Sequence, residues 1–179
     1  DIVKEYFPTD KDGWLYKMHP WFEFDPAASG TSAPFANQSW CNLVPYTTTG
    51  GAKKTARYRY NFLVRRTPFS ANDFTHVFSL VDAAAAYGSP GYAAKMENLA
   101  DMENWMRVFA ADHAAGNWDC LGGTTGQNLY AYLGALGTRF SLLMFDFNLV
   151  IGNPNSWGPG QNLFSSNGQD SNTPNIFKE

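Results

Sequence analysis

The sequence predicts an α+β fold, in which a helical layer supports a small antiparallel β-hairpin. Residues 101–115 have the apolar spacing of an amphipathic helix. Two short β-type runs follow, at 128–133 and 139–145, and a glycine-rich turn at 134–137 joins them. Only 16% of the residues are charged and 44% are hydrophobic, which suits a compact body with few solvated helical faces. The length is that of one domain, and we expect residues 1–179 to form one.

The helix over 101–115 is expected to bury one apolar face. Asp101 is placed to cap its N-terminus, and Gly116 ends it. The expected buried face is formed by Met102, Trp105, Met106, Phe109 and His113. We expect His113 to be a packed, hydrogen-bonded residue, because no second histidine or cysteine stands at metal-ligand spacing from it.

The upstream elements follow from the same kind of pattern. Alternation over 13–18 predicts a strand, whereas prolines and glycines interrupt any regular period over 25–45 and predict a loop. The S-x-x-D sequence at 70–73 has the form of a capping box, and an amphipathic helix should follow it and end near residue 87. A further helix is expected over 89–99, with Pro90 in its first turn.

The composition changes in two places along the chain. Six basic residues crowd into fourteen positions, namely Lys53, Lys54, Arg57, Arg59, Arg65 and Arg66. They form either a solvated surface strand or a patch for phosphate or an acidic substrate. Residues 153–179 are rich in Asn, Gly, Ser and Pro, and we expect an irregular tail packed on the domain.

The charge and hydropathy of the chain argue against two classes of partner, nucleic acid and the membrane interior. The net charge of −3 argues against nucleic acid as a partner, and no apolar run approaches the roughly 20 residues that a membrane span needs. The low lysine content and the many Asn, Ser, Thr and aromatic residues favour an exported protein. Because Asp1 is not an initiator methionine, we expect a processed or excised piece. Cys41 and Cys120 form either one disulfide or two free buried thiols.

A polar triple lies on the predicted helix and hairpin. Asp119 follows the helix, Asn128 opens the hairpin and Asp146 closes it. A helix, a loop aspartate, an asparagine, a hairpin and a second aspartate also make up a kinase catalytic segment. Carboxylate and amide oxygens suit Mg²⁺, but on spacing alone the three residues fit plain turn positions better, because Asp and Asn are common in turns. Asp146 stands in an apolar run, where a buried, unpaired carboxylate would be costly, so a metal or a cationic partner would explain it.

Several motifs resemble the CotH family, the spore-coat-protein-H-like atypical secreted protein kinases. These are G-N-W-D at 116–119, Q-N-L-Y-A-Y at 127–132 and L-M-F-D-F-N at 143–148, followed by Gly152. Upstream, G-W-L-Y-K at 13–17 and Y-N-F-L at 60–63 with S-A-N-D-F at 70–74 are similar to further family segments. The resemblance covers nearly all of the chain. It implies the C-terminal part of the kinase-like domain, with a fold like the C-terminal lobe of an atypical kinase.

The resemblance also implies roles for individual residues. Asp119 corresponds to the catalytic-loop acid, and Asn128 and Asp146 correspond to groups that bind the metal and the nucleotide phosphates. Asn148 stands where the family has a second metal-binding acid, so it offers an oxygen without a charge. The implied cofactors are ATP and Mg²⁺ (or Mn²⁺).

The function implied is phosphorylation of serine or threonine on extracellular or cell-surface proteins. The implied partners are a protein substrate and the N-terminal remainder of the kinase-like domain, and the implied location is secreted or at the cell surface. The alternative is a catalytically degenerate module in a surface assembly. Asn148 and the missing N-terminal part favour this alternative, whereas the intact Asp119, Asn128 and Asp146 favour the enzyme.

Overall fold

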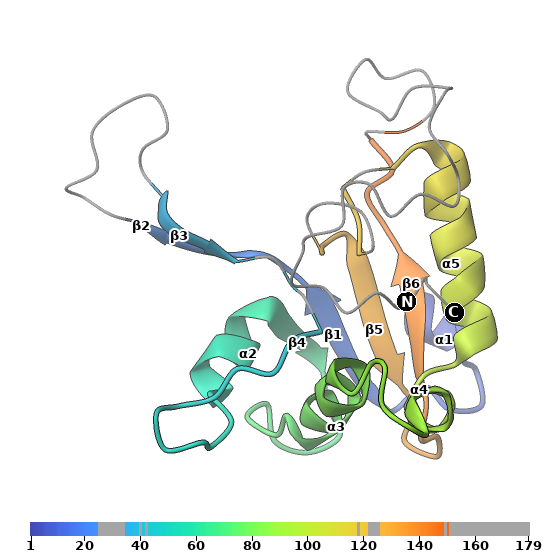
Figure 1. Cartoon of the computed structure of the whole chain (residues 1–179). Helices are drawn as coiled ribbons and strands as arrows, with labels where there is room; N and C mark the ends of the chain where they lie inside the picture. Colours follow the sequence, from blue (N-terminus) through green and yellow to red (C-terminus); the bar gives the residue numbers. More distant parts are fainter. Residues whose placement is uncertain are drawn as a thin grey trace.

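The computed structural model describes residues 1–24, 35–39, 41, 43–117, 119–121, 126–148 and 150, with the backbone alone for 21–24 and 35–39. It is a mixed α+β structure with several helices and a small four-stranded antiparallel sheet (Figure 1). In chain order its elements are α1 (Ile2–Tyr6), β1 (Trp14–Met18), β2 (Trp21–Phe24), β3 (Phe35–Ser39), α2 (Thr55–Asn61), β4 (Phe62–Arg66), α3 (Thr75–Ala85), α4 (Tyr92–Leu99), α5 (Met102–Ala115), β5 (Leu129–Leu133) and β6 (Phe140–Met144).

The main sheet has the strand order β4-β1-β5-β6. The hairpin predicted at 128–145 is confirmed as β5 and β6, which pair antiparallel with Leu129 opposite Met144. The strand predicted at 13–18 is confirmed as β1, and it lies between β4 and β5. The sequence pattern predicted this strand but not its central place in the sheet.

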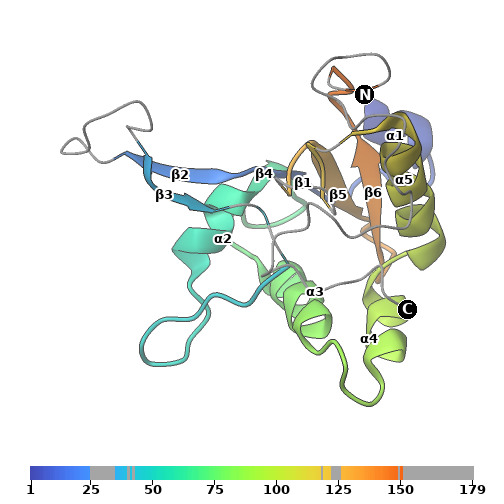
Figure 2. The same cartoon turned by 45° about the horizontal axis from the view of Figure 1, so that its top comes forward.

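The alternating side chains of β1 serve two layers. Trp14, Tyr16 and Met18 face the larger core, to which α2, α3, α4 and α5 contribute. On the opposite face, Leu15 packs in a smaller cluster with Val3 from α1. The sheet is therefore covered on both faces, and the helical layer expected from the sequence covers one of them (Figures 1 and 2).

Helix α5 is fixed alongside the edge strand β6. The Asn104 side chain donates to the Leu142 carbonyl (3.2 Å) and accepts from the Leu142 N–H (2.6 Å), so it pairs with the strand edge as another strand would. The indole N–H of Trp105 donates to the Phe140 carbonyl at 2.7 Å. A helix of 14 residues is about 21 Å long. Because α5 starts beside the first residue of β6, its last turn reaches the far end of that strand.

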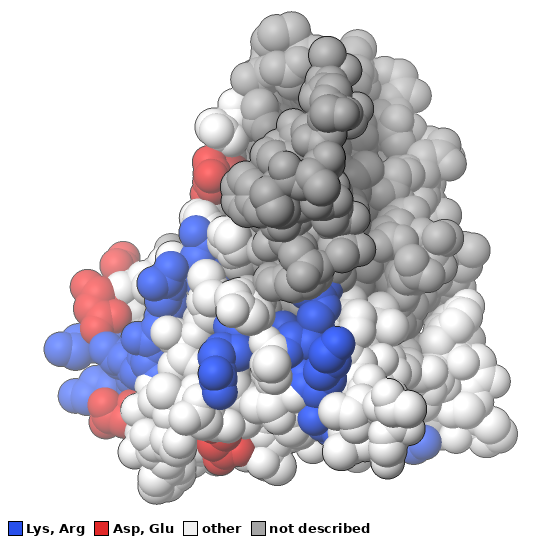
Figure 3. Space-filling view, turned by 90° about the vertical axis from the view of Figure 1, so that its left-hand side faces the viewer, with Lys and Arg blue, Asp and Glu red and all other residues white. Residues whose placement is uncertain are grey.

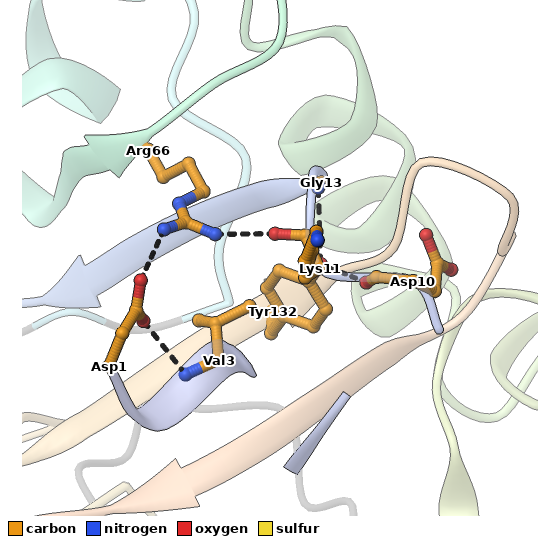
Figure 4. Close-up of polar contacts among 7 residues, drawn as sticks. All are labelled: Asp1, Val3, Asp10, Lys11, Gly13, Arg66 and Tyr132. Atoms are coloured by element: carbon orange, nitrogen blue, oxygen red, sulfur yellow. Dashed lines mark hydrogen bonds and ion pairs between the residues drawn. The ribbon is translucent and has the colours of Figure 1, made fainter. Parts of the chain in front are cut away.

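We call the end of the sheet where β1 begins the closed end; it comprises Asp1, Asp10, Lys11, Gly13, Arg66 and Tyr132 (Figure 4). Arg66 donates to the Asp1 carboxylate and to the Lys11 carbonyl, both at 2.5 Å. The Tyr132 hydroxyl donates to the Asp10 carbonyl and accepts from the Gly13 N–H at 3.1 Å. A Cβ on Gly13 would lie 2.0 Å from the Leu133 carbonyl oxygen, so only glycine fits there.

The opposite end of the sheet, where β1 and β6 finish and β5 starts, we call the open end. It comprises Asp119, Gln127, Asn128, Asp146 and Asn148. The C-terminal end of α5 leads to it, because that helix runs parallel to β6. The order of elements along the chain thus brings the helix–loop segment and the mouth of the hairpin to one place.

Some sequence predictions about the helices and loops are wrong in detail. The segment predicted as a loop over 25–45 contains β3, which pairs with β2 in a second, two-stranded sheet. Ser70 does not cap α3, because that helix begins at Thr75. Ser70 instead accepts from the Asn72 N–H, and Asp73 accepts from the Thr75 N–H at 3.0 Å, so both residues stabilise turns before the helix. Helix α4 begins at Tyr92, so Pro90 precedes its first turn.

Helix α5 is confirmed, with Asp101 as its N-cap and Gly116 in the left-handed conformation at its end. Its buried face is rotated relative to the expected one. Trp105, Val108, Phe109 and Asp112 are buried, whereas Met106 is 38% exposed. The expected face included His113 but passed over the neighbouring acid at 112.

The proposed disulfide is absent, because Cys41 and Cys120 are both free and buried. The Cys41 thiol donates to the Asn61 carbonyl (3.0 Å), beside the start of β4. The Cys120 thiol donates to the Asn117 carbonyl (3.2 Å), beneath the loop that follows α5. Each thiol therefore has its own backbone acceptor, and the alternative of two free thiols is the correct one.

The basic segment over 53–66 lies on one side of the molecule, where Figure 3 shows Lys and Arg interspersed with acidic side chains. Lys53 pairs with Asp82 and Arg66 with Asp1, while Arg57 is buried. Arg59 donates to the Asn72 side chain at 2.9 Å, so four of the six cations are used within the chain, which favours a structural use of those four. The expectation of a surface strand is wrong over Thr55–Asn61, which forms α2. The predicted tail over 153–179 lies outside the described residues. No helix in the described part of the chain combines the length and hydrophobicity of a membrane span.

Candidate functional site

The Asp119 carboxylate is held by two consecutive amide side chains. Asn128 donates through Nδ2 to Asp119 Oδ2 at 2.9 Å and to the Asp119 carbonyl at 2.8 Å. Gln127 donates through Nε2 to the other carboxylate oxygen, Oδ1. The two amides together hold both oxygens of the carboxylate and fix it in position. The structure therefore brings Asp119 and Asn128 into direct contact.

Asn128 and Asp146 flank the mouth of the hairpin in the same unusual backbone conformation. Their φ angles are 61° and 63°, and they are the non-glycine residues with positive φ in the described part of the chain. Asn and Asp enter this left-handed region more readily than other residues that carry a side chain. The Phe145 N–H donates to the Asn128 carbonyl at 3.2 Å, so Asp146 comes directly after the residue that pairs with Asn128. Asp146 and Asn128 therefore lie at the same end of the sheet.

Asp146 is exposed, which corrects the expectation that its carboxylate is buried in an apolar run. Strand β6 ends at Met144, and the left-handed turn at Asp146 takes the chain away from the core. An exposed carboxylate carries little burial penalty, so burial gives no reason to expect a metal or a cationic partner at this residue. Asn148, two residues further on, is exposed as well.

A lysine brings positive charge to the same end of the sheet. Lys17 Nζ lies 4.6 Å from the centroid of the Phe145 ring, and Phe145 directly precedes Asp146. The ring of Tyr130 packs on Phe145, with centroids 4.8 Å apart. Such cation–π contacts are modest in energy, about 0.5–1 kcal/mol at exposed sites, but they restrict the position of the ammonium group. The open end thus combines carboxylates, amides and one fixed cation.

The loop that carries Asp119 is also supported from below by two buried polar residues. Asn117 donates through Nδ2 to Asp112 Oδ1 at 2.8 Å, and its Oδ1 accepts from the Asp119 N–H at 3.2 Å. Sequence reasoning missed the roles of Asp112, Asn117 and Gln127. One signal could have indicated Asp112: it lies seven residues after Trp105, on the apolar stripe of the helix, where an acid is out of place.

The donor chemistry of the open end is compatible with a hard divalent cation. Because Asn128 Nδ2 uses its hydrogens on Asp119, its Oδ1 is the amide atom available to a cation. Asp146 offers an exposed carboxylate, and Asn148 offers an amide oxygen. No group of three or more His, Cys, Asp or Glu residues in the described part of the chain is arranged to hold a metal. These groups are too few for an all-protein cage, so a cation held here would also need oxygens from water or from a bound phosphate.

Comparison of the chain with protein-family models gave no match, and neither did comparisons with curated proteins and with solved structures.

Proposed function

We propose that this chain forms part of a phosphotransferase that uses ATP and Mg²⁺ (or Mn²⁺) to phosphorylate serine or threonine on secreted or cell-surface proteins. The observation that carries the proposal is the contact between Asp119 and Asn128 at the end of the sheet that also bears Asp146. Phosphoryl transfer requires little covalent chemistry from the protein. It requires oxygens that hold the metal and its phosphates, together with one group that accepts the proton of the nucleophile.

Asp119 is assigned the role of proton acceptor. As the substrate oxygen forms its bond to the γ-phosphorus, the bond from that phosphorus to the β–γ bridging oxygen breaks. ADP leaves, and the hydroxyl proton passes to the Asp119 carboxylate. Gln127 and Asn128 hold this carboxylate by its two oxygens, which reduces the reorganisation needed when the hydroxyl approaches.

Asn128 Oδ1, Asp146 and Asn148 are the groups assigned to the metal. A divalent cation bound there would neutralise phosphate charge and orient the transferred group. Asn128 links the two roles, because its nitrogen holds the proton acceptor while its oxygen faces away from that carboxylate.

The motifs that resemble the CotH family support the same assignment. The resemblance further implies that an N-terminal remainder of the kinase-like domain completes the nucleotide pocket. Tests of activity therefore belong on the complete parent protein.

A non-catalytic, kinase-like module in a surface assembly is the second candidate. Asn148 favours it, because the family motif has an acid at this position and an amide binds a divalent cation more weakly. The two candidates differ in nucleotide binding, which the catalytic form requires.

Calorimetric titration of the complete protein with ATP tests the proposal, in the presence and absence of Mg²⁺. We expect binding that depends on Mg²⁺ and that Asp146→Ala abolishes. Tyr132→Phe, at the closed end of the sheet, is the control and should bind as the wild type does. Absence of binding by the wild type at millimolar ATP would overturn the kinase assignment and leave the non-catalytic candidate.

A further inference from the structure

A buried acid lies beneath the loop that carries Asp119. Asp112 is in the last turns of α5, and both it and Asn117 are only 1% exposed. Asn117 Nδ2 donates to Asp112 Oδ1 at 2.8 Å. The phosphotransfer chemistry proposed above makes no use of Asp112.

The Asn117 amide connects this acid to Asp119. Its nitrogen is directed at Asp112, so its oxygen faces the other way and accepts the Asp119 N–H at 3.2 Å. The Asp112 carboxylate is an obligatory acceptor when ionised, and it therefore determines which way the amide is turned. A flipped amide would place its oxygen against the carboxylate and its NH₂ group against the Asp119 N–H.

The acid is not needed to end the helix. Gly116 adopts the left-handed conformation with φ 72°, and its N–H donates to the Asp112 and His113 carbonyls. The backbone of Asn117 donates to the Asp112 carbonyl as well, at 2.8 Å. The helix end is thus closed by backbone groups alone. The Asp112 side chain therefore has a different use.

The acid also has a cost. Burial raises the pKa of Asp112 to about 6, and hydrogen bonds from the Asn117 amide and the Cys120 thiol oppose that rise. An apolar residue at this position of the stripe would avoid the penalty of burying a carboxylate.

We propose that Asp112 is a positioning residue which, through Asn117, fixes the backbone of Asp119 and so the direction of its carboxylate at the open end of the sheet. The expected effect on phosphoryl transfer rests on the proposed function, whereas the fixed position of the Asp119 backbone does not. One measurement is therefore needed for each.

Amide hydrogen exchange at Asp119 gives the structural readout, measured in the complete protein. Asp112→Ala should speed exchange at this amide on the order of 10-fold, since hydrogen bonds to a charged acceptor contribute more than neutral ones. Exchange of the β5 amides should change no more than global stability requires. Met96→Ala is the control, because Met96 is buried in α4, away from the loop. It should speed exchange only in proportion to lost stability.

An exchanged pair of side chains gives a rescue test. Asn117→Asp places two carboxylates against each other and should loosen the loop as Asp112→Ala does. In the double variant Asp112→Asn with Asn117→Asp, the amide and the acid change places, and the hydrogen bond between them can form again. We expect the double variant to restore protection at Asp119 to within about threefold of the wild type. This test also serves if Asp112→Ala fails to fold.

The steady-state kinetics of phosphorylation give the second readout. Loosening the loop should lower kcat about 10- to 100-fold and leave KM for ATP almost unchanged, because Asp119 is assigned to the transfer step and not to nucleotide binding. Unchanged exchange at Asp119 in folded Asp112→Ala, or no rescue in the double variant, would overturn the positioning role. Loss of protection in a protein that never binds ATP would support the positioning role and overturn the proposed function alone.

Discussion

At the closed end of the sheet, side chains mainly bind the backbone of the chain, apart from the ion pair of Arg66 with Asp1, whereas at the open end two amide side chains hold the Asp119 carboxylate. Tyr132 and Arg66 satisfy carbonyls of the segment before β1, and Gly13 fits only because it lacks a Cβ. At the open end, Asn128 and Asp146 carry a side chain in the left-handed conformation, and Asp146 is exposed. Residues that depart from local preference concentrate at functional sites, so this contrast supports placing the site at the open end.

The largest effect on activity should come from removing the Asp119 carboxylate at the open end. Asp119→Ala should lower the rate of phosphoryl transfer on the order of 10²–10⁴-fold, the usual scale for loss of a general base. Nucleotide affinity should stay within a few-fold of the wild type, because the assigned metal groups are intact. Single-turnover assays and calorimetry measure the two quantities.

The matched control for this change is Asp82→Ala, which removes an exposed carboxylate that pairs with Lys53 on the basic side of the molecule. It should leave the transfer rate unchanged. An equal fall in nucleotide affinity and rate in Asp119→Ala would assign Asp119 to nucleotide binding instead.

A second prediction concerns stability and pH. Burial raises the pKa of Asp112 from 3.8 to about 6, so the folded state binds this proton more tightly than the unfolded state does. The resulting stabilisation is present below pH 3.8 and is lost as the pH rises through 6. Asp112→Asn removes the titration. The wild type should therefore lose about 2–3 kcal/mol of unfolding free energy relative to the variant when the pH is raised from 4 to 7.

Urea unfolding at a series of pH values measures this difference. Asp82→Asn, at an exposed acid, reports the effect of removing a surface charge. A constant difference between Asp112→Asn and the wild type over this range would mean that the Asp112 carboxylate ionises in the folded protein as easily as in the unfolded chain.

A third prediction concerns the closed end alone. Gly13→Ala would place a Cβ 2.0 Å from the Leu133 carbonyl oxygen, and backbone atoms must move to relieve the contact. We expect a loss of about 1–3 kcal/mol in the free energy of unfolding, the usual cost of overpacking. Nucleotide binding by the folded protein should not change. Gly50→Ala is the control, because the nearest atom to its added Cβ is Thr48 Oγ1 at 3.9 Å and its φ is not positive. Equal losses at the two sites would mean that the close contact at Gly13 is not the cause.

Local patterns predicted the elements on which the site depends. The hairpin was predictable because two β-type runs flank a glycine-rich turn, and α5 because Asp101 and Gly116 mark its ends. The contact between Asp119 and Asn128 follows from this order, since α5 and β6 run side by side. Strand β3 was missed because prolines and glycines near it in the sequence interrupt any regular period.

The rest of the site depends on backbone conformation that hydrophobicity does not encode. The apolar residues around Asp146 predicted burial, but one left-handed residue turns the chain out of the sheet. Asp112 was missed because the buried face expected for this helix did not include it. Its burial became evident only from the packing of α5 on the sheet.

The smallest predicted effect comes from a substitution that should strengthen metal binding at the open end instead of weakening it. Asn148→Asp adds a carboxylate two residues from Asp146, where the family that the motifs resemble has an acid. Affinity for divalent cations rises with the number of charged ligands, so Mg²⁺-dependent ATP binding should tighten by about tenfold, or about 1.4 kcal/mol. Asn98→Asp makes the same chemical change on the exposed side of α4 and should have no such effect. Calorimetric titration of both variants decides the matter. If both tighten binding equally, the effect is one of overall charge, and Asn148 has no place among the metal-binding groups. If neither does, while the wild type binds ATP, the metal at the open end is held by Asp146 and Asn128 without help from position 148.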